Sequence, residues 1–394
     1  MKKTLVALAA LSAISAFAQS SVQITGYADR GYTISKNSDG TASTKTLGSS
    51  AGTTRIEFRG TEDVGGGNKV GFFVESDWSE LGGASQTAAL KTTTQSSGFA
   101  NGESFVSFAS ATAGTLKLGA VNSLTFANAT GVAQPAFSTG IGSSYSVKFT
   151  TANGISTGVD GYGGQAQLQT TSATAASTGA RSVRIANTIN YVTPTYNGLT
   201  FGAAITPQND NVTANSGNGN TVGVKEVGVR YTQGAIDAAL TSIKTTVGSN
   251  GTNDYTLTLT GVTAQPGTAK ALTGGLTSTI NTLGATYATP VAGLKIHGGL
   301  TNSSSSNDLS SSKAKQFGAT YTVGMWDIMA QSIKVTDNST TATDRQNVGY
   351  GVNYNLSKTS RVYFRAEHIQ YATNQAAYAG NDLKRTALGI STAF

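Results

Sequence analysis

The sequence contains no cysteine and unusually few charged residues. Without cysteine, disulfides, thiolate metal sites and cysteine nucleophiles are all excluded. Charged residues make up 12% of the 394 residues, about half of the roughly 25% that is typical of soluble domains. Beyond the first 18 residues there is no run of about 18 apolar residues, so no helix predicted from the sequence could cross a bilayer. Without disulfides, the fold must be stabilised by backbone pairing and burial.

The first residues have the three parts of a secretory leader. A short basic start is followed by an apolar run from Thr4 to Phe17 and by an Ala-x-Ala sequence that ends at Ala18. The apolar run is too short for a membrane span, and a buried N-terminal helix would not need all three parts in this order. We predict cleavage between Ala18 and Gln19, which gives a signal peptide, residues 1–18, and an exported domain, residues 19–394.

The charge balance is basic but dispersed. The formal net charge is +7, and without the two leader lysines 25 basic residues face 20 acidic ones, a net charge of +5. No run of lysine and arginine is longer than two residues, and export argues against a nucleic-acid partner. Single charges scattered through strand-like segments are typical of a charged inner surface.

Period-two alternation dominates the chain after Ser21. In residues 347–356, Val348 and Tyr350 begin an apolar face that alternates with a face of asparagine and glycine. Residues 199–206 repeat the pattern. Successive side chains of a strand point to opposite faces, so each segment is predicted to be a strand with one apolar and one small or polar face.

Such strands suit either a soluble sandwich or an outer-membrane barrel, and two further features favour the barrel. A soluble sandwich of this size would need a surface of ordinary charge density, and short and long connections alternate strictly here, as in outer-membrane barrels. The eight long connections, all at one end, are 35–51, 79–102, 122–183, 207–222, 247–278, 303–313, 337–345 and 372–383.

Sixteen strands are predicted, an even number as in single-chain bacterial barrels. Because backbone groups in lipid need internal partners, the sheet must close and the first strand must pair with the last. The fold class is therefore an all-β, transmembrane, 16-stranded antiparallel barrel. The strands are 21–34, 52–62, 68–78, 103–110, 114–121, 184–193, 198–206, 223–232, 235–246, 279–288, 293–302, 314–323, 325–336, 346–356, 360–371 and 384–394.

Several of these strands resemble those of a known family, the trimeric general porins of Gram-negative proteobacteria. The most specific likeness is Arg55–Gly67, which is similar to that family's second strand and following turn. The other similar segments are Ser21–Asp29, Phe72–Glu75, Gly114–Gly119, Asn187–Pro194 and the terminal Phe394.

The resemblance implies a homotrimer in the outer membrane of a Gram-negative bacterium, in contact with outer-membrane lipid and lipopolysaccharide. It also implies a third loop folded into the barrel, and passage of small hydrophilic solutes and ions. Phe394 would be the C-terminal signal read by the barrel assembly machinery, and its ring suits the membrane interface. One departure is Ala120, where the family commonly carries an arginine.

The alternation also assigns side chains to the inside of the barrel. An Arg or Lys side chain on the lipid face near the midplane would destabilise the barrel by about 2–4 kcal/mol, so charged residues are expected at the inward-facing positions of each strand. We expect Arg55, Arg59, Lys69 and Lys117 to form a basic wall at a constriction; alternatively, they only solvate the interior and pair with Glu57 and Glu75. The predicted pore-lining set is Arg55, Glu57, Arg59, Lys69, Glu75, Lys117, Arg230, Arg361 and Arg365.

Nothing in the sequence indicates catalysis or a cofactor. His297 and His368 are the only histidines, no Gly-x-Ser-x-Gly sequence accompanies them, and no cluster has metal-ligand spacing. Gly65–Gly67 lacks the GK[ST] ending of a phosphate loop and is predicted to be a turn. We therefore predict no enzyme activity, no cofactor and no metal.

The function that follows is passive diffusion through a water-filled channel. The third connection has no acidic residue from Ser104 to Val159, so a basic wall would face a nearly neutral loop and favour anions. Two alternatives remain at this point: a solute-specific channel, and a barrel-based surface adhesin without a transport role.

Overall fold

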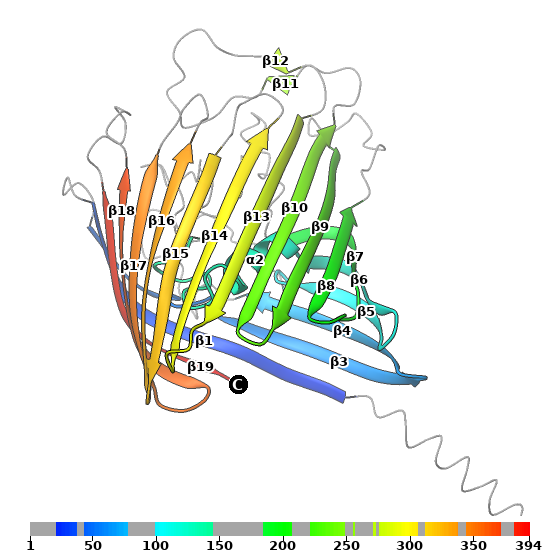
Figure 1. The fold of residues 1–394 in the computed structure, drawn as a ribbon, viewed down its shortest axis with the longest axis horizontal. Coiled ribbons are helices and arrows are strands. Elements are labelled where there is room, and N and C mark those ends of the chain that lie inside the picture. Colours follow the sequence, from blue (N-terminus) through cyan, green and yellow to red (C-terminus); the bar gives the residue numbers. More distant parts are fainter. Residues whose placement is uncertain are drawn as a thin grey trace, which may run out of the picture.

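The computed structural model is built around one antiparallel sheet that closes on itself (Figure 1). It describes residues 21–37, 43–77, 99–144, 184–206, 221–248, 255–256, 271–272, 276–305, 312–337, 344–371 and 382–394. The predicted signal peptide and its cleavage site at Ala18 and Gln19 lie outside the described residues. Among the described residues, no helix is both long and apolar enough to span a membrane.

Sixteen long strands form the wall, and each pairs antiparallel with its neighbours. The ring closes because the first strand pairs with the last from Tyr27 opposite Ala393 to Asn37 opposite Leu383, which confirms the predicted barrel. The sixteen are β1 Ser21–Asn37, β3 Arg55–Gly65, β4 Asn68–Asp77, β5 Ser104–Ser110, β6 Gly114–Asn122, β7 Arg184–Val192, β8 Leu199–Thr206, β9 Thr221–Gln233, β10 Ile236–Gly248, β13 Leu276–Ala288, β14 Leu294–Ser305, β15 Ser312–Val323, β16 Trp326–Asp337, β17 Arg345–Asn355, β18 Ser360–Tyr371 and β19 Leu383–Ala393.

The sheet also holds a short strand that the sequence analysis read as part of a long connection. β2, Ser43–Gly48, pairs with the half of β1 next to the long connections, whereas β3 pairs with the other half. The Ser/Thr-rich β2 is exposed up to the half-buried Gly48 and carries little alternation, so its pattern resembled a loop. Between β2 and β3, the segment Ser49–Thr54 interrupts the wall. A separate two-stranded ladder, β11 Tyr255–Thr256 and β12 Ala271–Leu272, lies within the predicted connection 247–278.

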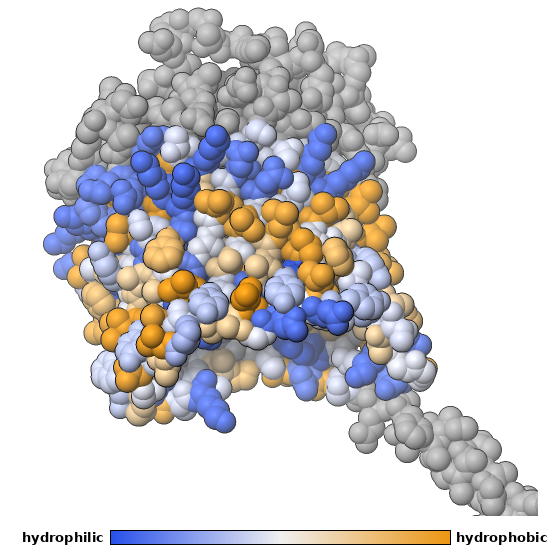
Figure 2. All heavy atoms as spheres, in the orientation of Figure 1, coloured by the Kyte–Doolittle hydropathy of each residue, from blue (hydrophilic) through white to orange (hydrophobic). Residues whose placement is uncertain are grey.

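The two faces of the sheet differ as predicted. Outward-facing Leu240, Leu283 and Leu300 stand in one cross-strand row and are each about half exposed, at 52%, 44% and 51%. Inward-facing Asn347 and Asn353 are 0% and 2% exposed. Figure 2 shows apolar side chains gathered in a band across the face of the wall that is turned to the viewer. An apolar exterior with a polar interior is the arrangement that a lipid environment requires.

A helix inside the barrel is the main feature that alternation did not predict. α2, Leu124–Gly131, follows β6 and lies within the ring of strands (Figure 1). It begins at Ser123, whose side-chain oxygen accepts a hydrogen bond from the Phe126 N–H at 2.9 Å and so caps the helix. At eight residues, α2 is too short to show a clear helical periodicity in the sequence.

The seam between β1 and β19 includes the terminal aromatic. The Gly26 N–H donates to the Phe394 carbonyl at 2.9 Å, and the Phe394 N–H donates to the Gly26 carbonyl at 3.1 Å. A Cβ on Gly26 would stand 2.5 Å from the Phe394 ring and 2.6 Å from the Arg55 carbonyl oxygen, so the terminal ring can lie at this position because residue 26 is glycine.

The outward row gives a direct test of the lipid-facing surface. Leu283→Arg should destabilise the barrel by about 2–4 kcal/mol relative to Leu283→Ala, because it puts a charge near the middle of a lipid-facing strand. The measurement is reversible urea unfolding in lipid vesicles. Leu283→Ala loses the same apolar contacts without adding charge. Equal stability of the two variants would mean that this row does not face hydrocarbon.

Candidate functional site

The third connection is held inside the barrel at the start of α2 by a buried carboxylate. Glu226 of β9 is 2% exposed. It accepts hydrogen bonds from the Leu124 N–H at 2.9 Å, and from the N–H and hydroxyl of Thr125 at 2.7 Å each. A negative charge at a helix N-terminus is favourable because the first N–H groups are unpaired and the helix dipole is positive there. Glu226 thus satisfies the end of α2 and fixes its position.

The body of α2 is fixed to the wall through backbone carbonyls. The Asn128 amide donates to the carbonyls of Ala239 and Thr282, at 3.1 and 3.0 Å. At Gly284 of β13, a Cβ would stand 2.3 Å from the Asn128 Oδ1, so any other residue would push the helix away. Beyond the helix, the Thr286 hydroxyl donates to the Val132 carbonyl at 2.6 Å.

The far end of the loop is held by strands on another part of the wall. The Gly142 N–H donates to Glu367 of β18 at 2.8 Å, and the Gln331 amide of β16 donates to the Gly142 carbonyl. Glu367 is 3% exposed and is also bonded to Asn347 and Arg385. Gly349 of β17 lies against this turn, where its Cβ would be 2.6 Å from the Gly142 Cα.

The segment Ser49–Thr54, which we call the bracket, contacts the same turn of the third connection. The Ser50 carbonyl accepts from the Ile141 N–H at 2.8 Å. Asp29 of β1, 1% exposed, accepts three N–H groups of the bracket, from Ser50, Ala51 and Gly52, at 2.7, 2.7 and 3.1 Å. Asp29 also accepts the Tyr363 hydroxyl. The interruption between β2 and β3 therefore supports the loop.

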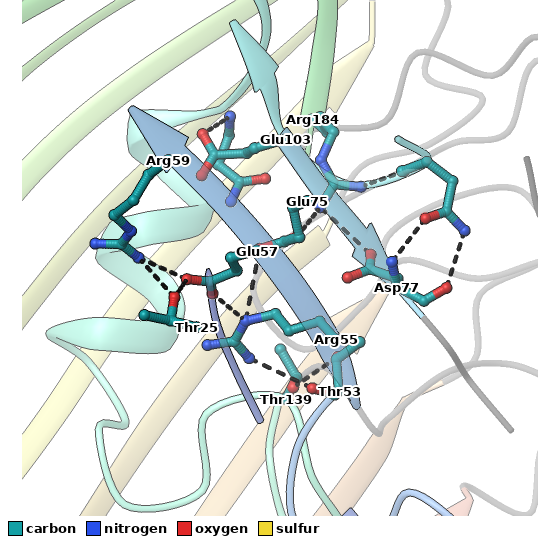
Figure 3. A network of polar contacts seen from close by, with 12 residues as sticks. Thr25, Thr53, Arg55, Glu57, Arg59, Glu75, Asp77, Glu103, Thr139 and Arg184 are labelled. Atoms are coloured by element: carbon teal, nitrogen blue, oxygen red, sulfur yellow. Dashed lines mark hydrogen bonds and ion pairs between the residues drawn. The ribbon is translucent and has the colours of Figure 1, made fainter. Parts of the chain in front are cut away.

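A polar network covers the inner face of β3 and β4 (Figure 3). Arg55 and Arg59 both donate to Glu57, each at 2.6 Å. Arg184 at the start of β7 lies 3.1 Å from Glu75 and 3.5 Å from Asp77, and Arg55 lies 3.5 Å from Glu75. Three arginines thus face three carboxylates: Arg55, Arg59 and Arg184 against Glu57, Glu75 and Asp77. For the arginines, this geometry agrees with the second expectation, in which the basic residues pair with Glu57 and Glu75.

Lys117 differs from these arginines because no ion pair joins it to any described residue. Its ammonium lies 4.5 Å from the centre of the Phe105 ring. That ring stacks on Phe73 with 5.5 Å between centroids, and the Arg59 guanidinium lies 5.4 Å from the Phe73 centroid. The stacked rings thus hold the unpaired Lys117 and the Glu57-paired Arg59 on the inner face of neighbouring strands, since a cation is attracted to an aromatic face.

The other predicted pore-lining residues do not join this network. Arg230 pairs with Asp237 at 2.6 Å near the short turn between β9 and β10, and Lys69 stands opposite Asp63 at the short-turn end of β4. Arg361 and Arg365 project inward from β18. Arg361 bonds the hydroxyls of Ser391 and Tyr27 at 3.2 Å each, and Arg365, 1% exposed, lies 5.3 Å from the Tyr363 ring centre.

Sequence reasoning did not single out the residues that hold the loop. Asp29, Glu226 and Glu367 have the inward parity that alternation reveals, but their partners are loop backbone atoms up to 225 residues away in the chain. Arg184 and Asp77 stand at strand ends, where parity is weakest. A buried-charge argument could have indicated Asp29 and Glu226, because an inward carboxylate that has no basic partner needs another set of hydrogen-bond donors.

Comparisons with known proteins agree with the barrel. The anion-selective porin from Comamonas acidovorans superposes with a TM-score of 0.67 at 22% identity, over 95% of this chain and 100% of that one. The in-vitro folded OmpT of Vibrio cholerae gives a TM-score of 0.61 at 13% identity, over 95% and 98%. OmpF of Salmonella typhi in complex with daunomycin gives 0.57 at 12% identity, over 95% and 97%. These likenesses concern the fold.

Two sequence comparisons add to this. Outer membrane porin protein 32 of Delftia acidovorans is 44% identical over 79 residues, 20% of this chain. That match spans about a fifth of the curated relative, 22% of its length. A family model described as Gram-negative porin matches residues 4–374.

The anchoring of α2 can be tested at Glu226. Glu226→Ala leaves the donors of Leu124 and Thr125 without their buried acceptor and should destabilise the protein by about 1.5–3 kcal/mol, the usual range for hydrogen bonds to a charged group. Glu226→Gln keeps one acceptor oxygen and should lose less. Chemical unfolding in detergent measures both, and single-channel current noise should rise in the same order. A Glu226→Ala variant as stable and as quiet as wild type would exclude the anchoring role.

Proposed function

Because this chain belongs to the Gram-negative porin family, we propose that it forms a water-filled channel for passive diffusion of small hydrophilic solutes and ions, with a preference for anions. The outer membrane of a Gram-negative bacterium is its location. The observation that carries the proposal is that the third connection is held across the interior of a closed barrel. Glu226 holds it at one end, and Glu367 and the bracket, which Asp29 positions, hold it at the other. A loop that is fixed at both ends narrows the channel, and because it is fixed it does not swing across the channel and close it.

The preference for anions is supported by which cations are left uncompensated. The arginines of the β3–β4 network are matched one for one by carboxylates, so they add little net field. Lys117 of β6 faces inward and has no ion pair with any described residue. Arg361 of β18 also faces inward and bonds hydroxyl groups, with Asp327 near enough to interact with it electrostatically. Cationic side chains along a pore wall favour anions. A structural relative is itself named an anion-selective porin.

Assembly and export belong to the same proposal. One similar structure, the OmpT of Vibrio cholerae, is described in its trimer form, and we propose a homotrimer for this chain. We also propose that residues 1–18 are removed on export and that residues 19–394 form the barrel. Insertion would use the barrel assembly machinery, with Phe394 as its signal, and the folded barrel would contact lipopolysaccharide.

Selectivity can be measured from reversal potentials in a KCl gradient across planar bilayers. We expect wild type to prefer chloride. Lys117→Gln should lower the anion-to-cation permeability ratio about two- to fivefold, as expected for one charge several ångströms from the ions in a medium of high dielectric constant. Arg361→Gln should shift the ratio in the same direction.

Lys358→Gln is the matched control, because Lys358 is exposed in the short turn between β17 and β18, away from the network. It should leave the ratio unchanged. A cation preference in wild type would refute the proposed selectivity, and an absence of channels in the bilayer would refute transport itself.

A further inference from the structure

Two phenylalanines stand on the inner face of the wall, where most side chains are polar or small. Phe73 of β4 and Phe105 of β5 lie directly opposite each other. Their neighbours in the chain, Phe72 and Val106, point outward and are 41% and 55% exposed. Both inner rings are half-buried, so part of each is exposed to the interior of the barrel. Apolar surface in contact with water is unfavourable, and the pair therefore indicates a use beyond packing.

The two rings differ from the inward aliphatic side chains at the end of the long connections. There, residues such as Val224 and Ile333 pack into buried clusters whose members are at most 6% exposed. Phe73 and Phe105 belong to neither cluster.

The wall around the two rings carries small residues on two sides. Toward the short turns, the next inward residues of β4 and β5 are Gly71 and Ser107, which face each other. On β6, Gly119 stands opposite Phe105. Because these neighbours are small, a solute inside the barrel can reach the rings.

A cation lies over each ring, and the strand order places the two cations on opposite sides of the stack. Arg59 stands opposite Phe73 on β3, and its guanidinium is 5.4 Å from that ring's centre. The Lys117 ammonium of β6 is 4.5 Å from the centre of the Phe105 ring. The rings are 5.5 Å apart with 22° between their planes. With cations over the outer faces, the ring edges, which carry partial positive charge, are left to meet solutes.

The stack stands on a different part of the wall from the strands that hold the third connection. The hydrogen bonds described above for that connection run to β9, β10, β13, β16 and β18 and to the bracket. Phe73 and Phe105 are on β4 and β5, which none of these bonds involves. A solute that passes between the held loop and this part of the wall meets the stack.

We propose that Phe73, Phe105 and Lys117 form a weak binding site for small aromatic carboxylates that pass through the channel. The negative face of a planar aromatic solute meets the positive ring edges of the stack in an edge-to-face contact. The carboxylate of the same solute pairs with the Lys117 ammonium, which has no ion pair with any described residue. Arg59 contributes less charge, because Glu57 pairs with it. This inference rests on the proposed anion-preferring channel and names one class of solute that it favours.

The test compares two solutes of equal charge and similar size, benzoate and cyclohexanecarboxylate, of which only benzoate is aromatic. Each is added at pH 7, where both acids are ionised, to wild-type channels in planar bilayers, and the fall in chloride current is measured. The fall should saturate at millimolar benzoate, because a solute that passes through must also leave. Benzoate should act at about three- to tenfold lower concentration than cyclohexanecarboxylate, as expected for one aromatic contact.

Matched double variants locate the aromatic contact. Phe73→Leu/Phe105→Leu keeps apolar side chains at both positions but removes the rings, and the ratio between the two solutes should fall to about one. Phe72→Leu/Phe108→Leu removes two rings from the same strands on the outward face, where they are 41% and 45% exposed, and should keep the wild-type ratio. If the inner double variant forms no channels, Phe73→Leu and Phe105→Leu are measured singly, and each should lower the ratio part of the way.

The partner of the carboxylate is tested at Lys117. Lys117→Gln should weaken the effect of both solutes about two- to fivefold and leave their ratio unchanged, since both carry the same charge. Lys117→Arg keeps the charge and should restore the wild-type concentrations.

Three outcomes would overturn the proposal. Equal action of the two solutes on wild type would show that the site does not recognise aromatic rings. An unchanged ratio in the inner leucine variants would mean that the two rings serve only to hold Arg59 and Lys117. Undiminished action of benzoate on Lys117→Gln would exclude Lys117 as the partner of the carboxylate. A failure of the proposed function would be recognised separately, as an absence of channels or a cation preference before either solute is added.

Discussion

The structure depends on one constraint: every backbone N–H and C=O of a strand in hydrocarbon must find a partner within the protein. The β1–β19 seam meets this requirement and removes the sheet edges. Once the ring is closed, each residue's parity decides whether it faces lipid or the interior. That is why leucine rows stand outside and buried asparagines, arginines and carboxylates stand inside.

Inside the ring, buried carboxylates are used for two purposes that are easily confused. Glu226, Glu367 and Asp29 accept backbone N–H groups of the third connection and the bracket, and so position chain segments; Glu367 pairs with Arg385 as well. Glu57 and Glu75 instead pair with arginines and cancel the charge of the wall they share. Net charge along the passage then depends on the cations left over, Lys117 above all. Counting basic residues on a wall is therefore a poor measure of its field.

Outside the ring the same parity separates two kinds of cation. Arginines, with their planar groups, are mostly inward, where they bind carboxylates and aromatic faces. The outward lysines lie at one boundary of the apolar band, in facing pairs that only the strand register reveals. A Lys315 or Lys334 read singly from the sequence is an unremarkable exposed charge, and the like-charge contact exists only because the two strands pair in that register.

Period-two patterning could predict most of the wall, because side-chain direction in a strand is set by local geometry alone. The alternation in residues 347–356 assigned Tyr350 to the outside and Asn347 to the inside, and the structure agrees. Patterning failed for β2, in which five of six residues are exposed, and for α2, which is too short to show a period. The inward parity of Arg55, Arg59 and Glu57 was predictable; whether the arginines would be free or paired was not.

By itself, then, the sequence determined the barrel, the order of its strands and the side on which each residue stands, because these follow from contacts between chain neighbours and from the demand of lipid for paired backbone. The tertiary structure alone decided where the third connection is held, which cations keep their charge and which lysines meet. Those outcomes depend on distances between residues such as Gly142 and Glu367 or Lys36 and Lys384, which are far apart in the chain and are brought together only when the ring closes.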